Sequence, residues 1–270
     1  MRLPIRLLAL LAGLLVLTGA APVEPPDSPP VQIVKKMIAA YGGVERWNAT
    51  RDGTFLMRVI AYGVTYGKPR VSETRVYFTK DPETMVRLDL KRSGQIHTRV
   101  YRGGEAWSDI DGEPTPTSPS LSSRIGYEAR SALLWVEFPF NLMAPDVRME
   151  FLGETELMGV RMYVLQVAWP EGIAISPGDV HRFYVNAATY LLLRQEYFSD
   201  GKPDQRMETF HGDYRSANGL LKDHLREIVS RENGRTDTRI EIEDLRFGLD
   251  LPPEFFLQAA VRSESESKGE

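Results

Sequence analysis

Residues 183–196, FYVNAATYLLLRQE, form the most informative stretch of this sequence. Two short apolar segments flank the small and polar residues Asn186–Thr189. Asparagine and threonine side chains form hydrogen bonds with nearby backbone groups and therefore favour turns. The stretch predicts two antiparallel strands joined by a tight turn, which Asn186 and Thr189 close through side-chain hydrogen bonds.

The same β pattern continues on both sides of this stretch. Val86, Leu88 and Leu90 alternate with charged residues, as do Ile240 and Ile242. Such alternation is typical of an antiparallel sheet with one buried face and one solvated face. The sequence therefore predicts a mainly β, antiparallel meander. Its hairpin turns are expected at pairs that accept a positive φ: Ser93-Gly94, Gly103-Gly104, Asp111-Gly112, Asp200-Gly201, Asn218-Gly219 and Asn233-Gly234.

Two predicted strands, Arg161–Val167 and Tyr190–Leu193, are apolar on both faces. A strand of this kind is covered on each side. Two interpretations remain open at this point. Either a helix covers one face and a loop covers the other, or the sheet curls and encloses an apolar cavity.

Two helices are expected to pack on the sheet. The first, Pro29–Tyr41, can be capped by Ser28, has a single apolar stripe and stops at Gly42-Gly43. The second, Ile125–Phe138, follows a Pro/Ser-rich segment that we expect to be a loop, and it stops at Pro139. Apolar residues surround more of this helix than one buried stripe requires. It is therefore either deeply buried or in contact with a ligand.

The first twenty residues have the features of a secretory signal peptide. Arg2 and Arg6 precede an apolar run, and small residues lead to an expected cleavage site after Ala20. The apolar run is shorter than the ~20 residues that span a bilayer. We therefore expect the protein to be exported to the periplasm and to be soluble after cleavage.

Composition sets the expected organisation of the mature chain. Residues 21–30 read as a Pro-rich linker, residues 31–261 as a single β domain, and residues 262–270 as a disordered tail without apolar residues. The chain has no cysteine, which excludes a disulfide, a thiol nucleophile and a lipid attached to an N-terminal cysteine.

The charge of the mature chain argues against nucleic-acid binding. Removing Arg2 and Arg6 from the 33 basic residues leaves 31 against 37 acidic residues, a net charge of −6. No basic block remains that would attract nucleic acid or anionic lipid.

The sequence contains no motif that indicates catalysis or metal binding. The histidines, His97, His181, His211 and His224, lack the spacing of metal ligands. A nucleophile elbow, a phosphate-binding loop and a dinucleotide fingerprint are also missing. We therefore expect no catalytic residue, no metal, no cofactor and no enzymatic activity.

Three segments together resemble the LolA/LolB-like superfamily of periplasmic lipoprotein carriers and outer-membrane lipoprotein-sorting proteins. They are residues 183–196, the helix end at Tyr41-Gly42-Gly43, and the closing segment Leu251–Phe256. The resemblance implies an α+β fold: a curled antiparallel half-barrel with helices on its concave face and an apolar cavity between them. Because there is no lipid-bearing cysteine, a membrane-anchored receptor of the LolB kind is excluded.

The resemblance also implies a function. The expected protein is a periplasmic binding or carrier protein that shields acyl chains of lipoproteins or lipids in its cavity, towards the outer membrane. Its partners would be acyl chains or lipoproteins, together with inner- or outer-membrane transport proteins, and it would be a monomer. An envelope sensor or adaptor that binds another protein is an alternative, and a hydrolase is a third.

The second predicted helix supplies the candidate ligand-binding residues. Leu134, Trp135 and Phe138 widen its apolar stripe near its C-terminal end. We expect the helix to lie across the mouth of the curled sheet as a lid, with Trp135 and Phe138 turned towards the cavity. The alternative is a fixed core helix.

Overall fold

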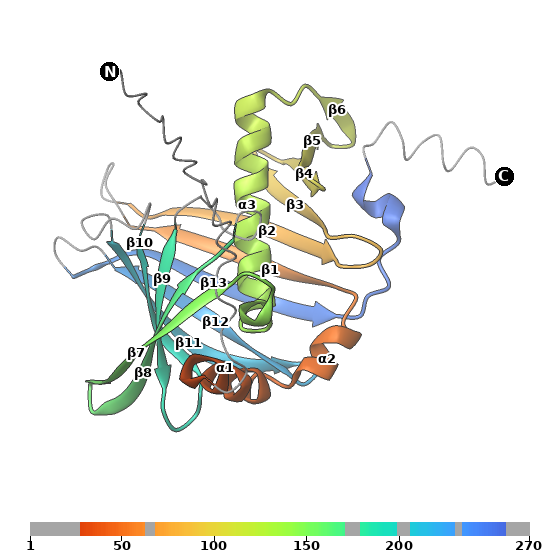
Figure 1. Ribbon diagram of the computed structural model, residues 1–270. Helices are drawn as coiled ribbons and strands as arrows, with labels where there is room; N and C mark the ends of the chain where they lie inside the picture. The colour runs from red at the N-terminus through yellow and green to blue at the C-terminus, as the bar shows by residue number, and fades with distance from the viewer. Residues whose placement is uncertain (1–27, 63–67, 171–178, 199–205, 230–233, 258–270) are drawn as a thin grey trace, which may run out of the picture.

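A single antiparallel sheet dominates the computed structural model, which describes residues 28–62, 68–170, 179–198, 206–229 and 234–257. Its 13 strands follow the order β6-β5-β4-β3-β2-β1-β13-β12-β11-β10-β9-β8-β7. The sheet thus consists of two meanders, β1–β6 and β7–β13, which meet where β1 pairs with β13. Within the described residues, β6 and β7 are the two edges, so the sheet curls without closing (Figure 1).

The strands of the first meander are β1 Asp52–Ala61, β2 Arg70–Thr79, β3 Met85–Arg92, β4 Gln95–Arg102, β5 Glu105–Ile110 and β6 Glu113–Thr115. Those of the second are β7 Arg148–Leu157, β8 Val160–Ala168, β9 Val180–Asn186, β10 Leu192–Phe198, β11 Arg206–Ala217, β12 Leu220–Val229 and β13 Thr236–Phe247. The helices are α1 Pro29–Ala40, α2 Val44–Ala49 and α3 Pro119–Glu137, with short 3-10 helices η1 Phe140–Met143 and η4 Pro253–Phe256.

Four of the predicted hairpin turns are confirmed. In Ser93-Gly94, Gly103-Gly104, Asp111-Gly112 and Asn218-Gly219, both residues have a positive φ, between 50° and 93°. This is the geometry of a two-residue turn that matches the twist of the flanking strands. The predicted turns at Asp200-Gly201 and Asn233-Gly234 lie wholly or partly outside the described residues, as do the expected signal peptide and tail.

The stretch 183–196 forms β9, a turn and β10, as predicted. The Asn186 side chain closes the turn by accepting hydrogen bonds from the backbone N–H groups of Ala188 (2.8 Å) and Thr189 (3.0 Å). Thr189 takes part through its backbone rather than its hydroxyl, which corrects the prediction for that residue. Tyr190 has a φ of 58° and belongs to the turn, so the strand begins at Leu192.

The main core fills the space between the concave face of the sheet and the helices. It joins apolar residues of α1, α3 and most of the strands into one cluster, which includes Val34, Met37, Val136, Phe183 and Phe247. Helix α3 packs on β3, β4 and β5, whereas α1 lies near β7 and η1 (Figure 1). Helix α1 begins at Pro29, as predicted, and Pro29 and Pro30 form its first turn, where the fixed φ of proline fits.

The doubly apolar strand Arg161–Val167 corresponds to most of β8, and its two faces contact different clusters. Leu165 and Val167 belong to the main core, whereas Met162 and Val164 pack with Tyr184 in a separate small cluster. Side chains of neighbouring strands therefore cover its second face. Neither a covering loop nor a cavity is needed to explain why both faces of this strand are apolar.

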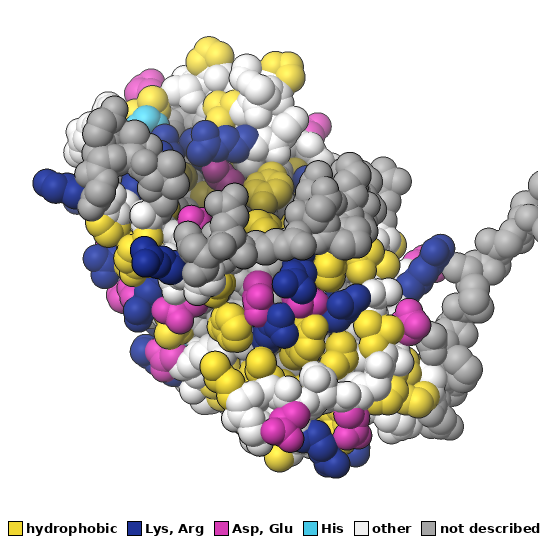
Figure 2. Space-filling view, turned by 90° about the vertical axis from the view of Figure 1, so that its left-hand side faces the viewer, with side chains coloured by type: hydrophobic (Ala, Val, Ile, Leu, Met, Phe, Trp, Pro, Cys, Tyr) yellow, Lys and Arg dark blue, Asp and Glu magenta, His cyan; other side chains and the backbone are white. Residues whose placement is uncertain are grey.

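Beside this small cluster, a buried carboxylate binds three arginines. Glu196 is 1 % exposed and lies within 3.3 Å of Arg182, 2.8 Å of Arg194 and 2.9 Å of Arg206, and it also accepts a hydrogen bond from Tyr184. The arginines cover the acid and compensate its charge. Figure 2 shows one side of the molecule, where Lys and Arg side chains are interspersed with Asp and Glu side chains and with apolar ones.

Gly42, at the end of α1, allows the first testable prediction. Its φ is +113°, and a Cβ there would lie 2.3 Å from the carbonyl oxygen of Gly219 in the β11–β12 turn. We expect Gly42→Ala to lower the free energy of unfolding by more than the ~1–2 kcal/mol that a left-handed backbone costs an L-residue. Gly94→Ala is the matched control, because Gly94 also has a positive φ (+86°) but no atom within 4 Å of the added Cβ. Urea denaturation measures the unfolding free energy of both variants. Equal losses for Gly42→Ala and Gly94→Ala would contradict the close approach of α1 to the β11–β12 turn.

Candidate functional site

Helix α3 is longer than predicted. It begins at Pro119 rather than Ile125, because the Ser118 hydroxyl caps it by accepting a hydrogen bond from the Leu121 N–H (3.3 Å). Proline fits the first helical position. The Pro/Ser-rich segment is thus the first turn and a half of the helix, not a loop. The helix ends at Glu137, just before Phe138-Pro139, because a residue that precedes proline is disfavoured in the helical conformation.

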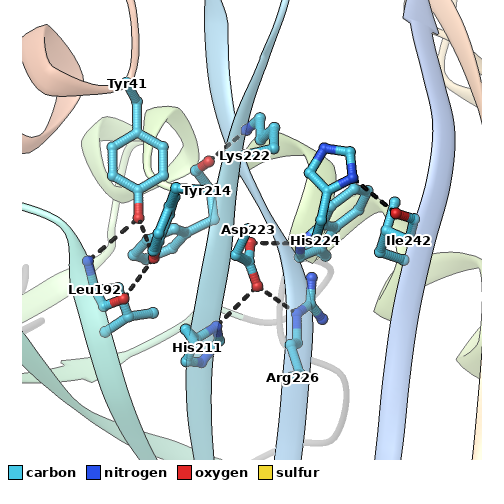
Figure 3. Close-up of polar contacts among 11 residues, drawn as sticks. Tyr41, Leu192, His211, Tyr214, Lys222, Asp223, His224, Arg226 and Ile242 are labelled. Carbon is cyan, nitrogen blue, oxygen red and sulfur yellow. Dashed lines mark hydrogen bonds and ion pairs between the residues drawn. The ribbon is translucent and has the colours of Figure 1, made fainter.

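The end of α3 is bound to the sheet through a buried acid, Asp223 on β12 (Figure 3). The Trp135 indole N–H donates to one carboxylate oxygen at 2.7 Å, and His211 and Arg226 contact the other oxygen at 2.9 and 2.7 Å. Burial alone would raise the pKa of Asp223, but the Arg226 charge and the His211 hydrogen bond lower it to about 2. The carboxylate is therefore ionised and holds three side chains in place.

A buried lysine binds backbone carbonyl groups at the C-terminal end of α3. Lys222 is 1 % exposed, and its ammonium group donates to the carbonyl oxygens of Val136 (2.6 Å) and Phe138 (2.5 Å). The last carbonyls of a helix lack partners within the helix and carry a partial negative charge, so a cation is well placed there. Rings of Trp47 and Phe140 lie 5.4 and 5.1 Å from the same nitrogen. Burial lowers the pKa of Lys222 to about 7.

Two tyrosines connect α1 to the same region. The Tyr41 and Tyr214 hydroxyls lie 3.0 Å apart, Tyr41 accepts from the Leu192 N–H at 3.3 Å, and Tyr214 donates to the Leu192 carbonyl (Figure 3). Burial raises the pKa of both tyrosines, so they remain neutral hydrogen-bonding groups. Both the last turn of α3 and the end of α1 are thus fixed against β10–β12.

A cavity of about 180 Å³ lies between the last turn of α3 and strands β9–β12. One part of its wall is apolar and includes Leu134, Trp135, Phe138, Phe183, Leu192 and Met207. The other part is polar and includes His181, Gln195, Thr209, His211 and Arg226. An apolar pocket with a few converging polar groups is the usual form of a small-molecule site.

A second, larger cavity of about 390 Å³ lies on the other side of α3. Three charged side chains, Glu83, Arg130 and Glu137, line it together with the turn Gly103-Gly104. Burial raises the pKa of Glu137. Three charged side chains line this larger cavity, whereas the two that line the smaller one, Asp223 and Arg226, form an ion pair. The smaller cavity is therefore the better candidate for an apolar ligand.

The structure places all three predicted ligand-binding residues on the wall of the smaller cavity. Leu134 is half-buried and borders both cavities. Phe138 packs edge-on against Tyr41 and Phe183, with ring centroids 5.9 and 5.2 Å apart. Trp135 is 7 % exposed and packs against Phe55 as well as bonding Asp223, so it also belongs to the core. Their role in ligand binding remains a prediction.

Sequence reasoning missed the polar part of the site. His211 and Tyr214 both reach the concave side although they are three positions apart, and Asp213, between them, has a φ of 51°. A strict period of two therefore does not hold along β11. The one available signal was the run Lys222-Asp223-His224 directly after two leucines, since three consecutive polar residues are unusual in a strand with a buried face.

The lowered pKa of Lys222 predicts a specific pH dependence. Between pH 7 and 10.5 the unfolded chain holds a proton that the folded protein has released, so stability should rise with pH across this window. Lys222→Met, which keeps the length and removes the charge, should reduce the slope of unfolding free energy against pH by up to about 1.4 kcal/mol per unit. Urea denaturation at pH 7, 8 and 9 measures both slopes. Identical slopes would contradict a buried, titrating Lys222.

Among the described residues, no group of three or more His, Asp or Glu side chains could hold a metal ion. No helix in that part of the chain is long and apolar enough to cross a membrane.

No protein-family model matches the sequence, and no curated protein does either. Solved structures do match the fold. A putative outer membrane lipoprotein-sorting protein domain from Vibrio parahaemolyticus is 13 % identical, with a TM-score of 0.52 over 86 % of this chain and 97 % of that one. The LolA superfamily protein NE2245 from Nitrosomonas europaea is 13 % identical, with a TM-score of 0.54 over 86 % and 98 %.

A DUF1329 family protein from Desulfovibrio piger is similar to the same extent, at 15 % identity and a TM-score of 0.53 over 86 % of this chain and 99 % of that one. At these identities the similarity concerns the fold. The chain has a LolA-like fold: an open, curled antiparallel sheet with helices, as the resemblance in the sequence implied.

Proposed function

We propose that this protein binds acyl chains in the periplasm and carries them, as part of lipoproteins or lipids, towards the outer membrane. The observation that supports this most is the apolar wall beneath the end of α3, on the concave side of an open LolA-like sheet. Shielding an acyl chain from water would stabilise the complex by about 0.8 kcal/mol for each buried CH₂ group.

The volume of the cavity limits what it holds in this conformation. At about 180 Å³ it is close in size to an engineered apolar cavity of ~150 Å³ that binds benzene. It therefore accommodates one end of an acyl chain, and a longer chain requires the wall to move. We propose that this movement occurs at Leu134 and Phe138, while Trp135 stays fixed by Asp223.

We propose no reaction for this site. The pair His211–Asp223 resembles the way a carboxylate orients a general base. Here, however, Asp223 also binds Trp135 and Arg226, and all four groups tie α3 to the sheet. This arrangement favours a structural role for the pair over catalysis.

Native mass spectrometry of the protein purified from its own periplasm tests the proposal. A carrier should retain lipid or acylated peptide, seen as additional mass that acidified solvent releases. Purified protein without any such mass, together with no uptake of lipid from vesicles of mixed acyl phospholipids, would reject acyl binding. In that case the LolA-like fold would serve as a sensor or adaptor.

A further inference from the structure

Three buried nitrogen atoms, each on a residue that lines the smaller cavity, carry hydrogens but have no acceptor among the described residues. They are Nε1 of Trp169, Nε2 of His181 and Nη2 of Arg226. Trp169 is 7 % exposed and His181 only 2 %. An unpaired buried donor is costly and is rare in native structures, so a group of three in one cavity indicates a missing acceptor.

The hydrogen on His181 can be assigned from its neighbour. Its Nδ1 lies 2.8 Å from Nε2 of Gln195, and an amide nitrogen can only donate. Nδ1 is therefore the acceptor, which leaves the ring hydrogen on Nε2. Burial lowers the pKa of His181 to about 4, so the ring is neutral at neutral pH.

The charges around the cavity distinguish between kinds of acceptor. The Arg226 guanidinium is 2.7 Å from the Asp223 carboxylate, which compensates its charge. Burial also lowers the pKa of His211, so neither histidine adds a positive charge. The cavity thus offers donors without a net positive charge. An incoming carboxylate would be buried without a counter-charge, which is unfavourable. A neutral carbonyl oxygen needs no counter-charge and can accept hydrogen bonds from these donors.

We infer that this polar part of the cavity binds the carbonyl oxygen of an esterified or amidated acyl chain, in preference to a free fatty acid. The inference rests on the proposed function and names its ligand class. The carbonyl would accept hydrogen bonds from the donors of Trp169, His181 and Arg226, and the first methylene groups would lie against Phe138 and Leu192. A cavity of this volume suits such an end group.

Four probes with one chain length test the inference: methyl octanoate, N-methyloctanamide, octanoate and n-octane, each titrated calorimetrically. We expect the ester and the amide to bind at least tenfold more tightly than octanoate or octane. The ester and amide arms also separate the two sources of such a carbonyl, a phospholipid-type ester and an N-acylated chain end. Octanoate binding more tightly than the ester would overturn the inference.

Trp169→Phe removes one donor and keeps an aromatic ring. It should weaken binding of the ester about three- to tenfold, as the loss of one hydrogen bond does, and leave octane binding unchanged. Trp107→Phe is the matched control, because its indole nitrogen is also buried without a partner but lies in a separate cluster with Val100 and Phe256. It should change neither affinity.

The results separate the inference from the proposed function. If the ester, the amide and octane bind equally, or if Trp169→Phe weakens ester and octane alike, the acyl-binding function stands and the carbonyl site is wrong. If none of the probes binds, acyl binding and the carbonyl site are both rejected.

Discussion

Asp223→Ala should lower the free energy of unfolding by about 3–5 kcal/mol, the usual cost of removing one partner from a buried ion pair. The substitution leaves the Arg226 guanidinium and the Trp135 indole without their shared acceptor inside the protein. It also removes the Trp135–Asp223 link between α3 and β12, although Lys222 still binds the end of α3. Chemical denaturation followed by circular dichroism measures the loss.

The control for this variant is an exposed ion pair in the same sheet. Glu154 lies 3.7 Å from Arg161, and their side chains are 47 % and 67 % exposed. Because exposed pairs contribute ~0–1 kcal/mol, Glu154→Ala should change stability little. If Asp223→Ala lowered the free energy of unfolding as little as Glu154→Ala, the contacts of Asp223 would not be what holds α3 on the sheet.

Trp135→Glu should have an effect of similar or greater size. The new carboxylate would replace a buried donor next to the ionised Asp223, and it would also remove the ring that packs against Phe55 at 4.7 Å. A large-to-small change at a buried aromatic residue costs about 3–5 kcal/mol even without a charge. We therefore expect the domain to unfold or to lose most of its stability.

Tyr127→Glu places the same charge on the same helix at a residue that is 50 % exposed, and it should be tolerated. The comparison uses thermal unfolding of both variants. A stable, folded Trp135→Glu protein would show that the end of α3 is free to leave the sheet at Trp135. That result would favour a lid in which the whole helix moves.

Local patterns in the sequence account for much of the fold. The positive-φ pairs marked the hairpin turns because glycine and asparagine adopt that backbone conformation easily. Alternation identified strands such as β3 because one of its faces is buried, as Val86 and Leu88 show. These features depend on a few neighbouring residues, so they can be read without the tertiary structure.

Features that depend on distant residues could not be predicted in this way. The start of α3 was placed too late, since Ser118 and Pro119 are common in loops as well as at helix N-termini. The pairing of β1 with β13 joins the first and last strands along the sequence, and no local pattern indicates it. Lys222 and Asp223 lie buried on β12 where they bind the end of α3, which is distant in the sequence.

Leu134 provides the most direct test of the central claim, that the cavity beneath α3 binds an acyl chain. Leu134→Glu should fold normally, because the side chain is half-buried at the rim between two cavities, and yet it should place a charge on the apolar wall. Leu152→Glu, at a residue 41 % exposed on β7, is the matched control.

The measurement is a titration of the wild type and both variants with a lysophospholipid that carries one palmitoyl chain, followed by tryptophan emission. The wild type and Leu152→Glu should bind with a clear emission change, since Trp135 and Trp169 line the cavity, and Leu134→Glu should bind at least tenfold more weakly. Equal affinities for all three proteins, or no emission change in the wild type, would contradict binding at this site.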